Sequence, residues 1–384
     1  MNKKRLIIFI PTIEDGGVEK NLFIISNYLK DKINNVYLIT ISNQFKKKFS
    51  KKIKFISLKS NVWDKLGRKK KFFIGLYLLF LEILKNRDSI VLCFQGNIYC
   101  TILCKLFGIK IIVRSNSSPE GWSQNFFKFF CFKYILRLAD KVIVNSLDFR
   151  KKFKTKFNIN AVCIYNPLNK KEIIKKSNIK SDYKLNKKKL NLINVGRLVD
   201  QKDQITLLKA INLIKKKINF NLLIVGKGSE RNNLLSYIKE NNLSKNVKLI
   251  GYKKNPYNLI KKSDVFLLTS IYEGLPNVLL ETQVLKTYII SSNCPTGPRE
   301  ILLNGKAGSL FKVRDYKGLS KMTIDISKAI FRKLATQGHV FSNETFRSLK
   351  ATYYRMALDM IQIYKSDAEM NGLKFDVHKE EEMV

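Results

Sequence analysis

The sequence is poor in histidine and has no paired cysteine motif. Only two histidines occur, His339 and His378, and both lie near the C-terminus. The six cysteines, at positions 93, 100, 104, 131, 163 and 294, include no Cys-x-x-Cys pair. A zinc cluster is therefore not expected, because such clusters need several Cys or His ligands at short spacing. This use of cysteine favours a reducing, cytoplasmic setting.

Long hydrophobic runs are also missing. The longest apolar stretch, residues 72–84, contains Glu82. It is shorter than the roughly 20 residues that a membrane-spanning helix needs. Residues 6–10 form an apolar run that is too short for the core of a signal peptide and fits a buried first strand better. The sequence therefore predicts no segment that crosses a membrane.

Acidic residues are strongly outnumbered by basic ones. Lys and Arg total 72 and Asp and Glu total 30, which gives a formal net charge of +42. A field of this size attracts polyanions such as nucleic acid, anionic lipid or phosphorylated substrates. The alternative is a general composition bias, because Lys, Asn and Ile are abundant together.

The length and the apolar content predict two domains. The chain has 384 residues, of which 45% are hydrophobic, so that each half can bury a core. Apolar runs alternate with helical segments in both halves, as expected for parallel sheets covered on both faces. The predicted strands of the first half are residues 6–11, 36–42, 53–58, 89–94, 109–114 and 141–145. Those of the second half are residues 190–196, 221–226, 247–251, 265–269 and 288–291.

The same pattern sets the predicted domain boundaries. The N-terminal domain is expected over residues 1–170, followed by a Lys- and Asn-rich linker at 171–189. The C-terminal domain is expected over 190–342. A helical segment at 343–365 and a disordered tail at 366–384 complete the chain.

Glycine turns follow several of the predicted strands. Gly16 and Gly17 come directly after the first strand and open a helix, and Gly226 and Gly228 form a similar turn in the second half. Glycine lets the backbone approach a ligand, and a helix N-terminus favours anions. Tyr252 follows the next strand, where a nucleotide could also rest. A purely structural turn is the alternative at each position.

Two basic residues follow the strand at 190–196. Arg197 and Lys202 are five positions apart and can converge on one diphosphate at the mouth of the sheet. The arginine side chain would donate hydrogen bonds to two phosphate oxygens at once, and the lysine ammonium would act as a point charge. In so basic a chain, such a pair is more often a solvated surface.

The segment 273–281 contains two carboxylates. Glu273 and Glu281 flank the turn Gly274-Leu275-Pro276, and the proline fits the first turn of a helix. Glu281 falls in an otherwise apolar stretch, where a carboxylate needs a hydrogen-bonding partner such as a sugar or ribose hydroxyl. Simple complementarity to the helix dipole is the alternative.

Together these motifs resemble the family 4 retaining glycosyltransferases. The motifs are Gly16-Gly17-x-Glu19, Val195-Gly196-Arg197 with Lys202, Val225-Gly226-x-Gly228, Glu273 with Glu281, and the run at 292–301. The match is dense over residues 190–310 and looser over 1–170. The resemblance implies the GT-B fold, in which two Rossmann-like domains face each other across a cleft and the last helix crosses back to the first domain.

The resemblance also implies roles for single residues. Arg197 and Lys202 would hold the donor diphosphate, Glu273 would bind hydroxyls of the donor sugar, and Glu281 would bind the ribose. Gly16 and Gly17 would approach the donor phosphate or the acceptor. Backbone amides near Pro276, Asn277 and Val278 would complete the binding site for the donor's sugar and phosphates. Members of the family transfer a sugar from a nucleotide diphosphate with retention, without a bound metal or cofactor, and this chain has no Asp-x-Asp pair.

The first half departs from the family at one position. Many relatives carry a histidine after the strand that matches residues 109–114, whereas this chain reads Arg114-Ser115-Asn116. These three residues are the candidates on the acceptor side, where they would act by hydrogen bonding.

Two stretches of the first half, residues 69–84 and 126–137, combine aromatic and basic residues. This combination suits an anionic membrane interface, and a core helix beside solvated lysines is the alternative.

Because related enzymes extend lipid-linked sugars or lipopolysaccharide, the expected acceptor is of that kind. The expected donor is a UDP-sugar, with an N-acetylhexosamine as one option, and the expected location is peripheral on the inner face of the plasma membrane.

Two other functions remain as alternatives: a nucleotide-sugar epimerase of the same fold, and a basic membrane-binding protein with a vestigial site. Nucleic acid is not an expected partner, because the sequence contains no recognisable nucleic-acid-binding module.

Overall fold

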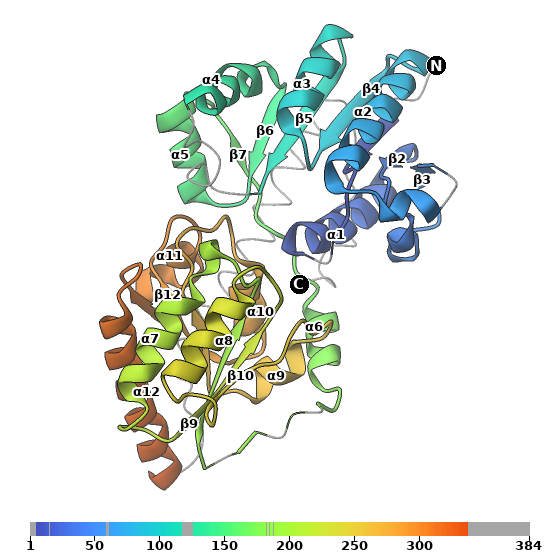
Figure 1. Cartoon of the computed structure of the whole chain (residues 1–384). Helices are drawn as coiled ribbons and strands as arrows, with labels where there is room; N and C mark the ends of the chain where they lie inside the picture. The colour runs from blue at the N-terminus through green and yellow to red at the C-terminus, as the bar shows by residue number, and fades with distance from the viewer. Residues whose placement is uncertain are drawn as a thin grey trace. The chain divides into compact units, whose positions relative to one another are not determined.

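The computed structural model describes residues 5–14, 16–58, 61–116, 126–181, 183, 185–186 and 188–336 (Figure 1). The chain divides into two compact units, Met1–Leu168 and Asn169–Val384. Each unit is built on its own parallel sheet with helices packed against it, which confirms the prediction of two Rossmann-like α/β domains. The predicted helical segment at 343–365 and the predicted tail at 366–384 lie outside the described residues.

Unit 1 contains a seven-stranded sheet in the order β3-β2-β1-β4-β5-β6-β7. Its strands are β1 (Arg5–Phe9), β2 (Val36–Ile39), β3 (Lys54–Ile56), β4 (Ser89–Cys93), β5 (Lys110–Ser115), β6 (Lys141–Val144) and β7 (Val162–Cys163). Its helices are α1 (Gly17–Lys32), η1 (Asn43–Lys48), η2 (Asn61–Lys65), α2 (Arg68–Lys85), α3 (Asn97–Leu106), α4 (Phe126–Ile135), η4 (Leu136–Leu138) and α5 (Leu147–Phe157). All paired strands run parallel.

The helices of unit 1 cover both faces of this sheet. The strand order reverses at β1, so right-handed crossovers place α1 on one face and α2 to α5 on the other. Side chains of α2, α3 and α5 accordingly share one core cluster with the sheet, for example Leu79, Cys100 and Phe153. Within this layer α3 packs between α2 and α4.

Unit 2 contains a six-stranded sheet in the order β10-β9-β8-β11-β12-β13. Its strands are β8 (Leu190–Val195), β9 (Phe220–Val225), β10 (Val247–Leu249), β11 (Val265–Leu268), β12 (Tyr288–Ser292) and β13 (Ser309–Phe311). Its helices are α6 (Lys170–Ser177), η5 (Asp200–Lys202), α7 (Gln204–Ile214), α8 (Arg231–Glu240), α9 (Tyr257–Lys262), α10 (Asn277–Val284), α11 (Pro298–Ile301), η6 (Leu303–Gly305) and α12 (Tyr316–Thr336). These strands are also parallel, and β8 lies at the centre, where the strand order reverses.

Four elements differ from the sequence interpretation. Helix α6 lies where a linker was expected; Asn169 caps it by accepting a hydrogen bond from the Glu172 amide at 3.0 Å, and Ile173 is buried. Strands β7 and β13 have two and three residues, too short for a clear apolar run. Helix α12 extends the described fold to Thr336.

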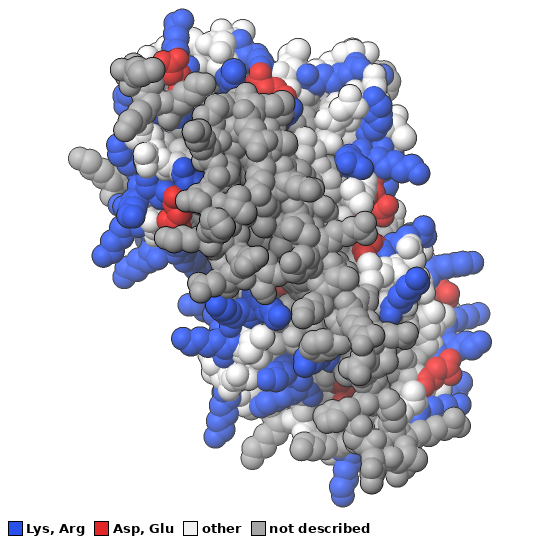
Figure 2. Space-filling view, turned by 180° about the vertical axis from the view of Figure 1, so that it is seen from behind, with Lys and Arg blue, Asp and Glu red and all other residues white. Residues whose placement is uncertain are grey.

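The surface reflects the composition. On the face shown in Figure 2, Lys and Arg side chains spread over much of the described surface, and Asp and Glu are scattered among them. In the part of the chain that the structure describes, no helix is both long and apolar enough to span a membrane.

Candidate active site

The predicted donor-side residues of unit 2 lie in loops at one edge of its sheet. Arg197 and Lys202 follow β8, Gly226 follows β9, Tyr252 follows β10 and Glu273 follows β11. Because all these strands are parallel, their carboxyl ends meet at the same edge. This edge is where open α/β sheets bind ligands.

Lys202 and Glu273 form an ion pair at this edge. Lys202 Nζ lies 2.5 Å from Glu273 Oε1, and the two side chains are only 16% and 7% exposed. Ser270 Oγ donates a second hydrogen bond to the same Glu273 oxygen at 2.6 Å. The Glu273 carboxylate is thus fixed by two donors from different loops, and pairing and hydrogen bonding offset the cost of burying its charge.

Backbone bonds hold the loop that carries Glu273. The Glu273 amide donates to the Pro295 carbonyl at 2.6 Å, and Thr296 Oγ1 donates to the Glu273 and Gly274 carbonyls at 3.1 and 2.9 Å. The Ile271 amide donates to the Gln201 carbonyl at 2.9 Å, which ties the loop to the segment that bears Lys202. The position of the carboxylate is therefore set by three loops.

Arg197 is more exposed than Lys202. Its guanidinium donates to Gln201 Oε1 at 3.4 Å, and its carbonyl accepts a hydrogen bond from Gln204 Nε2 at 2.9 Å. The backbone at Arg197 is therefore fixed, while the side chain reaches the solvent at the sheet edge. A cation in this position can approach an anionic group that arrives from solution.

The glycines after β9 allow two backbones to touch. A Cβ atom at Gly226 would lie 1.8 Å from the Gly196 carbonyl oxygen, and one at Gly228 would lie 2.0 Å from the Leu198 carbonyl oxygen. Glycine is thus required here by close packing of the loops after β8 and β9. Nearby, Lys227 Nζ lies 5.6 Å from the ring centroid of the exposed Tyr252, which is within cation–π range.

Helix α10 positions the second carboxylate. Glu281 is buried, and its Oε1 accepts a hydrogen bond from the Tyr257 hydroxyl at 3.0 Å. Pro276 stands at the N-cap of α10, followed by Asn277 and Val278 in the first turn. Their amides lie at the positive end of the helix dipole, which favours an anionic group.

The first-half candidates belong to unit 1. Gly16 is the N-cap of α1 and Gly17 is its first residue. Glu19 lies in the first turn of the same helix; burial raises its pKa above the usual value, while the Glu19 and Glu14 backbone amides oppose the shift. The turn after β1 therefore combines a helix N-terminus with a buried carboxyl group.

Arg114 is a buried structural residue rather than an exposed one. It is only 2% exposed, and its guanidinium donates to the Ile164 carbonyl at 3.2 Å and to Asn166 Oδ1 at 3.0 Å. A third bond runs to Asn116 Oδ1 at 3.3 Å, and Ser115 is buried at the end of β5. The network joins the carboxyl ends of β5 and β7, and the bond to Asn116 Oδ1 holds that side chain at the same edge.

Sequence reasoning missed Ser270 and Tyr257. Ser270 is the second residue after β11, so its place at the sheet edge could have been found from the strand pattern. Tyr257 gave no such signal, because it lies 24 residues from Glu281 and only the packing of α9 on α10 brings the two together.

Cys294 lies beside the same edge and is expected to be unreactive. Burial, reinforced by the negative charge of Glu273, raises the pKa of its thiol to about 12. The thiolate is the nucleophilic form of cysteine, so at about pH 8 the folded protein should keep Cys294 unmodified by iodoacetamide. Peptide mass spectrometry should show modification only after unfolding in urea. Rapid labelling of Cys294 in the folded protein would contradict the raised pKa of its thiol.

Comparisons with known proteins agree on one class of protein. Residues 175–329 match the family described as Glycosyl transferases group 1, and this range includes every unit 2 candidate from Arg197 to Glu281. An uncharacterized glycosyltransferase of Methanocaldococcus jannaschii is 33% identical over 220 residues, which are 52% of this chain and 53% of that protein. The chain thus spans about half the length of this relative.

A second relative has a more specific name. The N-acetylgalactosamine-N,N'-diacetylbacillosaminyl-diphospho-undecaprenol 4-alpha-N-acetylgalactosaminyltransferase of Campylobacter jejuni is 27% identical over 259 residues, 63% of this chain and 69% of that enzyme. Among solved structures, HepE of Anabaena in complex with UDP matches with a TM-score of 0.72 at 14% identity, covering 95% of this chain and 100% of HepE. This likeness shows the fold, which is the two-unit α/β fold of GT-B glycosyltransferases.

Proposed function

We propose that the chain is a retaining, metal-independent family 4 glycosyltransferase. It would move a sugar, with an N-acetylhexosamine as first choice, from a UDP-sugar to a lipid-linked saccharide or an acceptor of the lipopolysaccharide or O-antigen type. The observation that carries this proposal is the buried Lys202–Glu273 pair beside the glycine turns at the carboxyl edge of the unit 2 sheet. The group 1 match over residues 175–329 supports the same class.

In this proposal the site binds the donor through opposite charges. The diphosphate would attract the Lys202 ammonium and the Arg197 guanidinium, while Glu273 accepts hydrogen bonds from the sugar hydroxyls. As the bond between the sugar and the diphosphate breaks, negative charge grows on the leaving phosphate, and the two cations stabilise it. The acceptor oxygen then bonds to the anomeric carbon on the same face, and its proton passes to the leaving phosphate oxygen.

The remaining candidates would bind other parts of the donor, or the acceptor. Glu281, held by the Tyr257 hydroxyl, would accept from the ribose hydroxyls. The exposed Tyr252 ring would pack against the base, and the first-turn amides of α10 would bind phosphate or sugar oxygens. Asn116, oriented by Arg114, would hydrogen-bond the acceptor.

The activities for which similar proteins are named support the donor and acceptor classes. The Campylobacter jejuni relative is named for a diphospho-undecaprenol-linked acceptor, and the structure of HepE contains UDP. With a lipid-linked acceptor, the protein would work in the cytoplasm, attached peripherally to the inner face of the plasma membrane.

Nucleotide release tests the proposal. The purified protein is incubated with single nucleotide-sugars and a bacterial membrane-lipid extract, with and without EDTA. We expect UDP release from one UDP-N-acetylhexosamine that requires the extract and persists in EDTA. Absence of release with every donor, or complete loss in EDTA, would contradict the proposal. Conversion of a UDP-sugar into its epimer without the extract would instead favour the epimerase alternative.

A further inference from the structure

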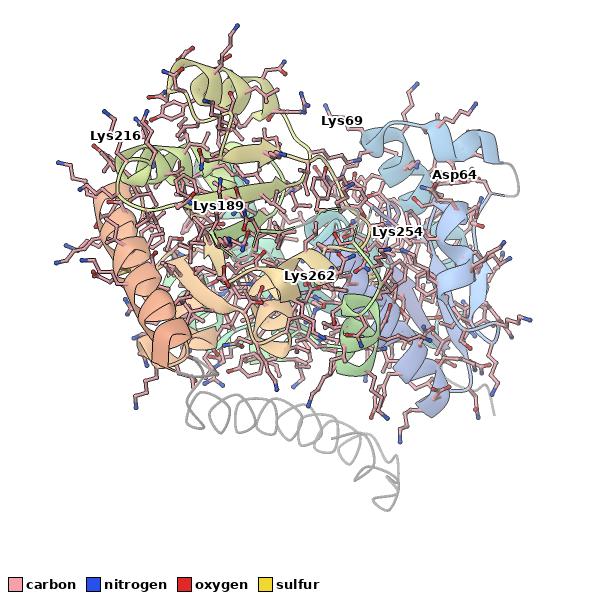
Figure 3. The ribbon with its side chains drawn as sticks, turned by 90° about the horizontal axis from the view of Figure 1, so that it is seen from below. Asp64, Lys69, Lys189, Lys216, Lys254 and Lys262 are labelled. Carbon is pink, nitrogen blue, oxygen red and sulfur yellow. The ribbon has the colours of Figure 1, made fainter. Side chains whose placement is uncertain are left out.

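The carboxyl edge of the unit 1 sheet carries a group of asparagines. One asparagine follows each of four neighbouring strands, β4, β5, β6 and β7, which adjoin in this order (Figure 1). These residues, here named the asparagine cluster, are Asn97, Asn116, Asn145 and Asn166. The residues that link them to their strands, 94–96 and 164–165, are uncharged. Figure 3 labels two charged residues of unit 1, Asp64 and Lys69, which belong to other elements, η2 and α2.

Arg114 holds three members of the cluster together. Its backbone carbonyl accepts a hydrogen bond from Asn97 Nδ2 at 3.2 Å. Its guanidinium donates to Asn116 Oδ1 at 3.3 Å and to Asn166 Oδ1 at 3.0 Å. The cation is only 2% exposed, so it is the buried centre of the cluster, and the amides surround it.

Asn145 joins the cluster through the register of the sheet. It directly follows Val144, which pairs with Ser115 in the parallel ladder of β5 and β6. Asn145 and Asn116 therefore leave neighbouring strands side by side, with their backbones about 5 Å apart. Asn145 is only 2% exposed, yet its Oδ1 accepts no hydrogen bond within the described part of the chain. A buried amide oxygen without a donor costs free energy, so such an atom calls for an explanation.

The hydrogen bonds of the cluster decide which atoms it can offer to a ligand. A side-chain amide has one oxygen that accepts and one nitrogen that donates. Asn97 uses its nitrogen on the Arg114 carbonyl, and its Oδ1 accepts no hydrogen bond from the residues that the structure describes. Asn116 uses its oxygen on the guanidinium, which leaves Nδ2 as its donor. The cluster thus offers two acceptor oxygens, from Asn97 and Asn145, and one donor nitrogen, from Asn116.

We propose that the asparagine cluster binds the acetamido group of an acceptor sugar. The N–H of that group would donate to one of the two amide oxygens, and its carbonyl would accept from Asn116 Nδ2. A neighbouring sugar hydroxyl would donate to the second oxygen. A phosphate or carboxylate fits less well, because it has no hydrogen to donate to either oxygen. A hydroxyl in place of the acetamido group is shorter and cannot reach as far between the side chains.

This inference rests on the proposed function, because its ligand is the acceptor of the proposed transfer. Sugar binding is nevertheless measured without a nucleotide, which separates the two failures. If no donor releases UDP but the acetamido preference is found, the cluster assignment stands and the transfer reaction is wrong. If UDP release is equally fast with acceptors that have and lack acetamido groups, the transfer reaction stands and the cluster assignment is wrong.

Saturation-transfer NMR with the full chain tests the proposal. The probes are the methyl glycosides of N-acetylglucosamine and N-acetylgalactosamine, compared with those of glucose and galactose. One test variant, Asn145→Leu, keeps the approximate size of the side chain but removes its oxygen. The other, Asn116→Asp, keeps an oxygen for Arg114 but replaces the donor nitrogen. The control is Asn160→Leu, at an exposed asparagine of unit 1. Circular dichroism melting monitors the folding of each variant.

At least one N-acetylated glycoside should bind the wild type about tenfold more tightly than its hydroxyl counterpart, because that counterpart leaves buried amide groups unpaired. The preference should disappear in both test variants and persist in the control. Asn145→Leu should melt no lower than the wild type, because its oxygen has no described hydrogen bond to lose. The absence of a preference in the wild type overturns the proposal. So does a lower melting temperature of Asn145→Leu with an unchanged preference, because the oxygen would then bind internal water.

Discussion

Replacing Glu273 with glutamine is expected to lower the rate of sugar transfer about 100-fold or more, the scale at which single electrostatic groups act in active sites. Glutamine keeps the size of the side chain but removes the charge that pairs with Lys202 at 2.5 Å. It also accepts weaker hydrogen bonds from sugar hydroxyls. Initial rates of UDP release with a saturating lipid acceptor measure the effect, and Glu240→Gln, at the exposed end of α8, is the matched control.

A second variant separates catalysis from stability. Breaking a buried ion pair leaves an unpaired charge, so Glu273→Gln should also lower the melting temperature. Adding Lys202→Met removes that charge, and the double variant should regain stability while staying inactive. If Glu273→Gln turns over at the wild-type rate, the assignment of this carboxylate is wrong. If activity returns together with stability in the double variant, the pair is structural only.

Replacing Gly226 with alanine is expected to destabilise unit 2 by about 3 kcal/mol or more, because backbone strain and overpacking act together. The added Cβ would lie 1.8 Å from the Gly196 carbonyl oxygen, so the loops after β8 and β9 must separate. In a unit of this size the melting temperature should fall by about 6–12 °C. Thermal unfolding followed by circular dichroism measures the shift.

Gly251→Ala is the matched control for this substitution. Gly251 has a positive φ of +71°, but no atom lies within 4 Å of a Cβ at its position. Alanine there meets backbone strain alone, which costs about 1–2 kcal/mol. Equal melting temperatures for the two variants would show that the close approach at Gly226 does not constrain the fold.

The strand pattern made much of unit 2 predictable. Each predicted strand of that half overlaps an observed one, and residues that directly follow the strands, such as Arg197 and Gly226, could be assigned to the carboxyl edge. Helix α6 was missed because its short amphipathic stretch buries Ile173 and Ser177 and is otherwise rich in lysine. Such a helix is stabilised by packing against α9 and α10 rather than by its own propensity.

The partners of the candidate residues were not predictable to the same degree. Lys202 and Glu273 were both identified, but their ion pair joins residues 71 positions apart. Arg114 was identified as a candidate on the acceptor side, yet its guanidinium is buried on the Ile164 carbonyl and Asn166. A side chain's type and its position after a strand predict that it lies at the carboxyl edge of the sheet. Its hydrogen-bonding and ion-pair partners are not predicted in this way, because they come from loops that are distant in the sequence.

The sequence by itself determined the two α/β units, the glycine turns and the residues at the strand ends, because these follow from local periodicity and from backbone sterics. Tertiary structure alone decided that Lys202 neutralises Glu273 and that Tyr257 holds Glu281. It also decided which side of helix α2 is exposed. Helix α2 is apolar on several sides. Its sequence periodicity shows that each side carries a row of apolar residues, but only packing against the sheet decides which row is buried.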